Sequence, residues 1–301
     1  MIYCLKSFYG GSMRTDKWIR KNTRSLCGKV VAISGSTGGL GRELVRHIAS
    51  LSGELVLIDR NVEKSKALAE EIRSEFPNVK ISHVKADMSD IESVKMAEKE
   101  LSNMEIDYLI LNAGAYSIPR YTMDLGYDNV FTINFISPYY LARKLLPKIK
   151  ARGGKIVTVG SIAHNYSKID EKDIDFSKRK QASLVYGNAK RYLTYSLFAL
   201  DSENIAITHP GISFTGITNH YPPIIFALIK HPMKVIFMKP RRACLSILAG
   251  LFENTRANEW IGPSLLDVWG VPKKKTLRTA KPAEAKKITE IAEEIYNKIN
   301  N

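Results

Sequence analysis

Cysteines are few in this sequence, and they are scattered. The three of them, Cys4, Cys27 and Cys244, have neither the spacing of a disulfide framework nor that of a metal site. The opening segment also lacks the pattern of a secretory signal peptide. A reducing, cytoplasmic setting is therefore expected, with no bound metal.

Long hydrophobic runs are also scarce. The longest apolar stretch, residues 221–238, is interrupted by Lys230, His231 and Lys234, so it does not qualify as a membrane-spanning helix. No repeat, low-complexity block or linker divides the 301 residues, of which 45% are hydrophobic. Such a chain can bury one large core, and a single α/β domain of this length is common.

Negative charge is in short supply, and the excess of positive charge lies largely at the two ends. The net charge is +15; residues 1–30 carry seven Lys or Arg against one Asp, and residues 272–301 carry eight against four Glu. A basic end can meet nucleic acid or an anionic membrane, or it can be a solvated tail. Because no nucleic-acid-binding motif accompanies the charge, no nucleic-acid partner is expected. Peripheral membrane contact remains an alternative to the solvated tail.

Strand-like apolar runs alternate with helical patterns along most of the chain. This alternation predicts βαβ units, and hence a single-domain Rossmann fold: a doubly wound parallel sheet of about seven strands with helices on both faces. The predicted strands are 29–34, 54–59, 79–87, 107–112, 155–161, 204–210 and 260–262, and the predicted helices are 39–51, 61–76, 89–103, 124–150 and 184–200. We expect a basic extension at 1–27, the domain at 28–262, and a C-terminal extension at 263–301 whose helix, 282–299, packs on the body.

A glycine-rich turn, SGSTGGLG, joins the first predicted strand to the first predicted helix. Binding a pyrophosphate requires backbone N–H groups at a helix N-terminus and residues without bulk where the backbone approaches the phosphates. Gly35, Gly39 and Gly41 supply this with the spacing G-x-x-x-G-x-G. A lone glycine pattern also fits an ordinary tight turn, but the flanking strand and helix favour a dinucleotide site.

Two residues at the end of the second predicted strand give conflicting signals about the dinucleotide. Asp59 can accept hydrogen bonds from both adenosine ribose hydroxyls and repel a 2′-phosphate. Arg60 can attract that phosphate instead, or simply face solvent. Because the glycine turn contains no basic residue, the balance favours NAD(H), with NADP(H) as the alternative.

Further candidate cofactor contacts lie where other predicted strands end. Asp87 ends the third strand, where the adenine would lie, and Asn112, Ala113 and Gly114 end the fourth. Ligands of such sheets bind outside the carboxyl ends of the strands. The shared position of these residues therefore predicts that they contact one cofactor.

A tyrosine and a lysine four residues apart form the candidate catalytic pair. Tyr186 and Lys190 share one face of a predicted helix, and Ser161 ends the strand before it. A tyrosine with an ordinary pKa near 10 is a poor base, and a neighbouring cation lowers that pKa. Tyr140 and Lys144 have the same spacing, but no serine-bearing strand end precedes them, so we interpret that pair as structural.

These motifs together resemble the short-chain dehydrogenase/reductase family over about residues 28–262. The resemblance implies that Tyr186 is the general acid/base, Lys190 its pKa modulator and a ribose ligand, and Ser161 the group that orients the substrate. It also implies that Asn134, in TINFISP, holds a water in the proton relay. The cofactor contacts implied by motif and resemblance are Gly35, Ser36, Thr37, Gly39, Leu40, Gly41, Asp59, Arg60, Asp87, Met88, Asn112, Ala113, Gly114, Tyr186, Lys190, Pro210, Gly211, Ile212 and Thr215.

Within the family the chain most resembles the branch of retinol dehydrogenases and light-dependent protochlorophyllide reductases. The resemblance rests on VGSIAH around Ser161, on the insert IDEKDIDFSKRK and on a tail past the last strand. Three positions depart from the usual pattern. Ala189 replaces a serine, Ser34 replaces a threonine but keeps the hydroxyl, and Asp59 departs from the NADP habit of this branch.

The resemblance also implies a substrate lid at about 213–240, and this stretch is rich in Pro, Ile, Phe and Met. An apolar lid predicts a lipophilic substrate such as a steroid or retinoid. His164 and Tyr192 are candidates for the pocket wall, although buried, hydrogen-bonded positions are the commoner role for such residues. Family members often pair through the helices that carry Asn134 and Tyr186, which makes a homodimer or homotetramer an expectation.

The sequence thus predicts an NAD(P)-dependent oxidoreductase that interconverts a lipophilic secondary alcohol and its ketone. Two alternatives remain open: reduction of a carbon–carbon double bond with the same tyrosine, and a catalytically silent dinucleotide-binding sensor or scaffold. The presence of all four residues of the Asn-Ser-Tyr-Lys set argues against the silent sensor.

Overall fold

The computed structural model describes residues 13–211, 238–277 and 281–300. Of the predicted site residues, Ile212 and Thr215 lie outside these ranges, as does most of the predicted lid at 213–240. Within the described ranges, none of the helices combines the length and apolar character that crossing a membrane requires.

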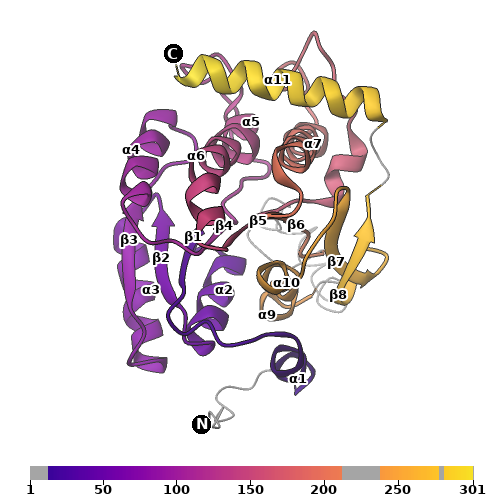
Figure 1. The fold of residues 1–301 in the computed structure, drawn as a ribbon. Coiled ribbons are helices and arrows are strands. Elements are labelled where there is room, and N and C mark those ends of the chain that lie inside the picture. The colour runs from indigo at the N-terminus through magenta and orange to yellow at the C-terminus, as the bar shows by residue number, and fades with distance from the viewer. Residues whose placement is uncertain (1–12, 212–237, 278–280, 301) are drawn as a thin grey trace, which may run out of the picture.

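The described strands form one eight-stranded sheet in the order β3-β2-β1-β4-β5-β6-β7-β8 (Figure 1). The first seven run parallel, and β8 pairs antiparallel with β7 at the edge. Strands β1, β2, β4, β5 and β6 are buried almost throughout, because helices cover both faces and leave no solvated side. The bounds are β1 Val30–Ser34, β2 Glu54–Asp59, β3 Ile81–Lys85, β4 Tyr108–Leu111, β5 Lys155–Val159, β6 Ile205–Thr208, β7 Glu259–Leu265 and β8 Trp269–Thr276.

Helices cover the sheet on both faces, with one apolar core on each (Figure 1). One layer contains α4 (Ile91–Ser102), α6 (Ser137–Ala151) and α7 (Ala182–Asp201). The other contains α2 (Gly39–Ser50), α3 (Val62–Glu75) and α10 (Leu245–Phe252), with the short α9 (Pro240–Ala243) beside it. The predicted doubly wound α/β fold is confirmed.

Side chains cap two helices close to their predicted starts. The Asn61 side chain accepts a hydrogen bond from the Lys64 N–H, and Asp90 accepts from the N–H groups of Glu92 and Ser93. Each cap satisfies backbone donors that have no partner inside the helix. These two starts could therefore be placed from local sequence.

The structure differs from the sequence-based expectation at four places. The single helix predicted over 124–150 begins only at α5 (Asn129–Phe131), continues through a π-helical turn, η1 (Thr132–Ile136), and then becomes α6. Helices α1 (Met13–Asn22), α9 and α10 were not predicted. Nor was β8, which carries the sheet past residue 262 and makes eight strands instead of seven.

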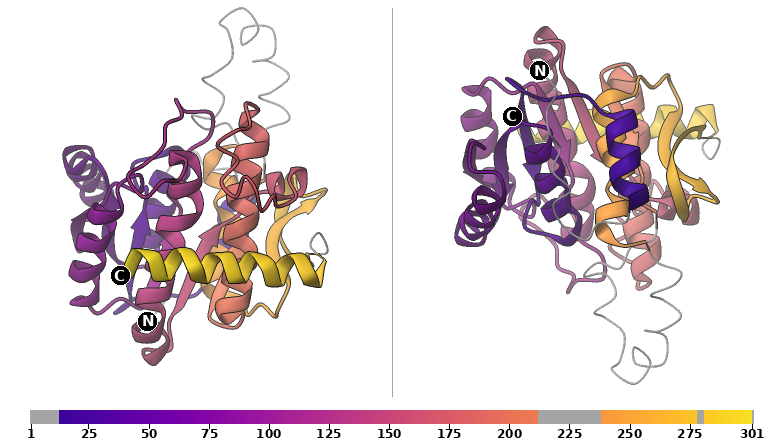
Figure 2. Two further views of the ribbon diagram at one scale, coloured as in Figure 1. Left: turned by 90° about the horizontal axis from the view of Figure 1, so that it is seen from above. Right: turned by 90° about the horizontal axis from the view of Figure 1, so that it is seen from below.

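Helix α11 (Pro282–Asn300) adds a further layer outside α6 and α7, as Figures 1 and 2 show. Its apolar face buries Ile288, Ile291, Ala292, Ile295 and Ile299, which join the apolar core on the side of α6 and α7. A homodimer formed through α6 and α7 would have to include or displace α11. On the opposite side α1 packs near α10, and Asp16 pairs with Arg241 at 2.9 Å (Figure 2).

Candidate active site

The glycine turn leaves β1 and enters α2 with almost no free space around its glycines. Gly35 has a φ of +67°, a conformation that side chains disfavour, and an added Cβ would lie 2.9 Å from the Ala113 Cα. A Cβ on Gly41 would collide with the Gly35 carbonyl. Because α2 begins at Gly39, the turn brings a helix N-terminus to the carboxyl ends of the strands.

Asp59, at the end of β2, is 4% exposed and faces back toward this turn. The Ser36 hydroxyl donates to one carboxylate oxygen of Asp59, and the N–H and hydroxyl of Thr37 donate to the other at 3.2 and 3.1 Å. The carboxylate therefore holds the turn in place. The Arg60 side chain is 76% exposed, and its Nε lies 3.8 Å from Asp87 Oδ2.

The ends of β3 and β4 lie beside the turn. Asp87 accepts hydrogen bonds from the N–H and hydroxyl of Ser89, and the Met88 carbonyl accepts from Ser137. The Asn112 amide donates to the carbonyls of Ser34 and Gly35 at 3.1 and 3.0 Å. These bonds connect β1 to β4, so the Asn112 side chain braces the two neighbouring strands.

The Ser34 hydroxyl makes a second connection between the same strands. It accepts from the N–H groups of Asn112 and Ala113, both at 3.1 Å. Ser34 stands where the family usually has threonine, and the hydroxyl that both residues carry makes these two hydrogen bonds.

Asn134 lies in the π-helical turn η1, and its side chain is fully buried. The amide nitrogen donates to the carbonyls of Ala115 and Val130 at 2.8 and 2.9 Å, and the amide oxygen accepts from the Ala115 N–H at 3.2 Å. The side chain thereby fixes the loop that follows β4. Single π-helical turns are frequent at functional sites because they shift backbone groups out of the regular helical pattern.

Ser161, Tyr186 and Lys190 meet where β5 ends and α7 begins. The Ser161 hydroxyl is a hydrogen-bond partner of the Tyr186 phenol. The Lys190 ammonium lies 5.7 Å from the centre of the Tyr186 ring and donates to the Val159 carbonyl at 2.8 Å. The i, i+4 spacing on α7 places both side chains on the face that meets β5.

Burial shifts the pKa of Tyr186 and that of Lys190 in the directions that favour the neutral form of each side chain. It raises the pKa of Tyr186 to about 12, against a lowering effect of the Ser161 hydrogen bond. It lowers the pKa of Lys190 to about 7, because the ammonium is removed from water. A neutral phenol beside a lysine that titrates near pH 7 can hold and pass a proton.

The sequence analysis missed Tyr116, in the loop after β4. Its ring meets the Tyr186 ring edge-on, with centroids 5.3 Å apart. Ile118 and Leu184 pack in the same apolar cluster. No local pattern marked Tyr116, because it belongs to a loop whose path depends on Asn134.

The two residues predicted to line the substrate pocket, His164 and Tyr192, are both fully buried. Tyr192 is fully buried between Phe131 and Phe135, so its position supports the core role and not a substrate contact. His164 is also fully buried, and its Nδ1 hydrogen-bonds the Ser161 carbonyl. The substrate-lining prediction for both residues is not supported by these positions.

Pro210 and Gly211 follow β6 at the same edge of the sheet. Beside them, His209 Nε2 lies 2.9 Å from the carbonyl of Asp267, in the turn between β7 and β8. A Cβ on Gly211 would lie 2.5 Å from the Val268 carbonyl, so this turn packs closely against the segment. Leu40, in the first turn of α2, completes the described part of the predicted cofactor set.

The residues at this edge fit a dinucleotide. The glycine turn leaves no room for side chains between α2 and the end of β4, and a Cβ on Gly114 would lie 2.9 Å from Asn134 Oδ1 and 3.7 Å from Lys190 Nζ. A helix N-terminus, bare backbone and an acidic residue at the end of β2 thus lie together. These are the features that pyrophosphate and ribose binding require.

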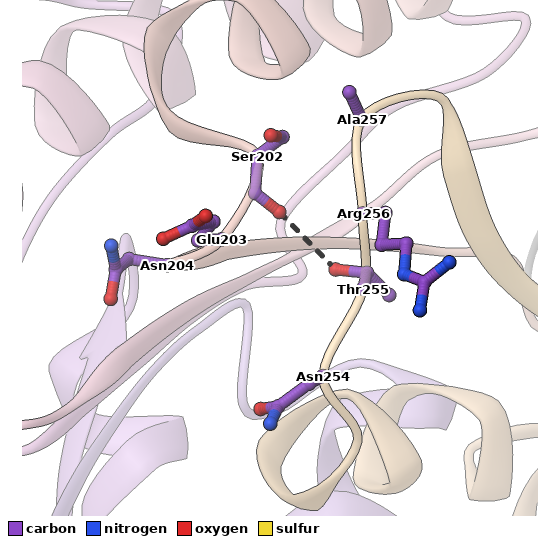
Figure 3. A pocket seen from close by; sticks show the side chains of 7 residues that line it. All are labelled: Ser202, Glu203, Asn204, Asn254, Thr255, Arg256 and Ala257. Carbon is purple, nitrogen blue, oxygen red and sulfur yellow. Dashed lines mark hydrogen bonds between the residues drawn. The ribbon is translucent and has the colours of Figure 1, made fainter.

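A separate recess of about 570 Å³ lies at the opposite ends of the strands. Figure 3 shows that two loops form it, joined by a 3.5 Å hydrogen bond from Thr255 to the Ser202 carbonyl. Its lining is Ser202, Glu203, Asn204, Asn254, Thr255, Arg256 and Ala257. Because these residues precede β6 and β7, the recess is remote from the catalytic edge.

Comparison with known proteins identifies the family. Residues 29–171 match the short chain dehydrogenase profile. Retinol dehydrogenase 12 of Mus musculus is 30% identical over 225 residues, which cover 71% of this chain and 69% of that protein. Retinol dehydrogenase 13 of Homo sapiens is 28% identical, covering 68% and 69%.

The solved structures support the same fold. A crystal structure of a protein from Mycobacterium Paratuberculosis aligns with a TM-score of 0.70 and 20% identity, covering 92% of this chain and 96% of that one. The chain belongs to the short-chain dehydrogenase/reductase family, in its retinol dehydrogenase-like branch, and is an NAD(P)-dependent oxidoreductase acting on alcohols.

Proposed function

We propose that this enzyme interconverts a lipophilic secondary alcohol and its ketone, with Tyr186 as the general acid/base. One observation carries the proposal. The Tyr186 phenol is hydrogen-bonded to Ser161 and lies beside the buried Lys190, at the carboxyl edge of the sheet. When bound there, a nicotinamide cofactor supplies or accepts the hydride.

Tyr186 transfers the proton of the reacting hydroxyl. With a pKa of about 12 the phenol is protonated at neutral pH, which is the form that donates a proton to a ketone oxygen as it gains negative charge. Ser161 donates a hydrogen bond to the same oxygen and orients it toward the phenol.

Lys190 and Asn134 assist this proton transfer without contacting the reacting oxygen. A lysine that titrates near pH 7 can return a proton to the Tyr186 phenolate after each turnover. Its cationic form also stabilises the phenolate. Asn134 keeps the loop after β4 closed against Gly114, next to the Lys190 ammonium.

We propose NAD(H) as the preferred dinucleotide. The negative charge of Asp59 is fixed beside the glycine turn by Ser36 and Thr37, where it opposes a 2′-phosphate. Arg60 lies 3.8 Å from Asp87, whose carboxylate offsets its charge. NADP(H) remains the alternative that a direct comparison of the two cofactors decides.

The lipophilic substrate is inferred from the surroundings of Tyr186. The edge-on ring of Tyr116 and the partly buried Ile118 and Leu184 give the site apolar walls. The relatives named as retinol dehydrogenases act on retinol, a lipophilic primary alcohol, which supports the lipophilic character of the proposed substrate.

A cofactor-oxidation screen tests the proposal. Purified protein receives NADH or NADPH with a panel of ketosteroids, retinal and small ketones, and the absorbance of the reduced nicotinamide is followed. We expect turnover of a lipophilic ketone, faster with NADH, that Tyr186→Phe abolishes while dinucleotide binding persists. Silence with every ketone despite tight dinucleotide binding would contradict the proposed substrate class.

A further inference from the structure

A buried ion pair joins the C-terminal helix to the helix of the catalytic pair. Arg191 directly follows Lys190 on α7, and its side chain is 3% exposed. Its Nε and Nη2 donate to the two carboxylate oxygens of Glu284, in the first turn of α11, at 2.8 and 2.7 Å. Such bidentate pairs have a defined geometry as well as strong charge-assisted hydrogen bonds.

The same ion pair also holds the turn that follows Ser161. Arg191 Nη1 donates to the His164 carbonyl at 2.9 Å, within the 3-10 turn η2 (Ile162–Tyr166). Glu284 Oε1 accepts from the Ile169 N–H at 3.2 Å, just beyond that turn. The Glu284 carboxylate and the Arg191 guanidinium thus connect α11 and α7 to two points of the segment between β5 and α7: the His164 carbonyl and the Ile169 N–H.

The turn η2 is in turn coupled to the catalytic serine. Ser161 caps it, with its hydroxyl accepting from the Ala163 N–H at 3.2 Å and its carbonyl from the His164 N–H at 3.2 Å. On the other side, Gly187 packs so closely that a Cβ there would collide with the Ala163 carbonyl. A shift of the His164 carbonyl would therefore be transmitted to Ser161.

Charge makes this arrangement sensitive to Glu284. A buried guanidinium cannot lose its proton, so it needs a partner of opposite charge, and removing that partner leaves an uncompensated charge. Burial alone would raise the pKa of Glu284, but hydrogen bonds from Arg191 and the Ile169 N–H hold it below its usual value. The Glu284 carboxylate therefore stays ionised at neutral pH.

We infer that Glu284 is a positioning residue, which acts through Arg191 to set the place of Ser161 against Tyr186; this inference rests on the proposed function. It assigns the C-terminal helix a role in catalysis beyond covering α6 and α7. Glu284 touches neither substrate nor cofactor. Its effect reaches the site only through the turn η2.

The chain contains a matched control, because α11 is anchored a second time by Glu293. That carboxylate accepts from the Tyr139 hydroxyl at 2.9 Å and pairs with Arg143, both on α6. Among the described residues, the hydrogen-bond and ion-pair partners of Glu293 lie on α6 and not on η2. If α11 only stabilises the fold, losing either anchor should have the same consequence.

The experiment compares Glu284→Gln with Glu293→Gln in the full chain. Both variants should melt at lower temperature than wild type. Only Glu284→Gln should lower kcat, by about 10- to 100-fold with little change in the KM for dinucleotide, because a small displacement of a positioning group is costly. Equal kcat values in the two variants would overturn the inference.

Hydrogen exchange provides a readout that does not require turnover. The amides of 163–167 should exchange faster in Glu284→Gln than in Glu293→Gln, and unchanged exchange in both would also overturn the inference. If wild type shows no turnover, the proposed function fails while exchange still tests the coupling to η2. Should Glu284→Gln not fold, Glu284→Asp keeps the charge with a shorter reach, and an intermediate loss of kcat is expected.

Discussion

Two tyrosine–lysine pairs in this molecule have the same spacing and nearly the same geometry. The lysine nitrogen lies 5.7 Å from the ring centre in Tyr186–Lys190 and 5.6 Å in Tyr140–Lys144. Burial raises the pKa of either tyrosine to about 12. The pairs differ in the side chains around them. The i, i+4 spacing of tyrosine and lysine is therefore not enough to identify a catalytic site.

The first pair is buried beside a polar side chain. Tyr186 has the Ser161 hydroxyl as a partner, and Lys190 is 2% exposed with a pKa lowered by burial. The second pair instead lies under α11, where the Tyr296 ring is 5.9 Å from Tyr140 and 5.8 Å from the Lys144 nitrogen. Its structural interpretation agrees with these contacts.

The largest expected effect comes from removing each phenol in turn. Tyr186→Phe should lower kcat/KM by about 10³-fold or more, because general acid/base catalysis contributes about 10²–10⁴-fold. Tyr140→Phe should leave kcat/KM within about threefold of wild type. Steady-state kinetics on both variants measures this, and equal losses would erase the distinction between the pairs.

Replacing the lysines should separate activity from stability. Lys190→Met should lower kcat by about 10²-fold and yet raise the melting temperature, because a buried ammonium is exchanged for an apolar side chain of similar length. Lys144→Met should change neither by much. A Lys190→Met protein that melts well below wild type would contradict the burial argument.

The same variant has a defined pH dependence. Lys190 has a pKa of about 7 in the folded state and an ordinary value of 10.5, so the unfolded state binds more protons between those values. Wild-type stability therefore rises with pH between about 7 and 10.5, and this gain is lost as pH falls back to about 7, below which Lys190 is protonated in both states. Denaturant titrations should show that the excess stability of Lys190→Met over wild type shrinks as pH rises across this window. An excess that does not change with pH would refute the lowered pKa of Lys190.

A smaller effect is expected at the serine, which only the first pair possesses. Ser161→Ala should lower kcat about 10- to 100-fold, because one hydrogen bond to the reacting oxygen is lost while Tyr186 remains. Ser161→Thr keeps the hydroxyl and serves as the control. Kinetics that leave Ser161→Ala at the wild-type rate would remove this residue from the proposed mechanism.

The smallest effect on activity is expected where the second pair meets α11. Tyr296→Ala should cost about 1–2 kcal/mol of stability, since it removes ring contacts with Tyr140 and a cation–π contact with Arg143 at 4.0 Å. We expect kcat to stay unchanged. Thermal unfolding and kinetics on one preparation test both halves, and a fall in kcat would link this region to the site.

Much of the fold was predictable because its signals are local. The turn from β1 into α2, the caps Asn61 and Asp90, and the alternation of buried strands with helices all depend on neighbours within a few residues. The π-helical turn at 132–136 was not predictable, because the bonds of the Asn134 side chain to Ala115 form only when two distant segments meet.

The residues of the site divide in the same way. Sequence by itself determined the order of glycine turn, Ser161, Tyr186 and Lys190, since their spacing from strand ends is written along the chain. Only the tertiary structure decided that Tyr116 meets Tyr186, that Tyr192 belongs to the core, and that Glu284 holds Arg191 from 93 residues away. The physical reason is that burial and long-range pairing depend on how the layers pack, which no local pattern encodes.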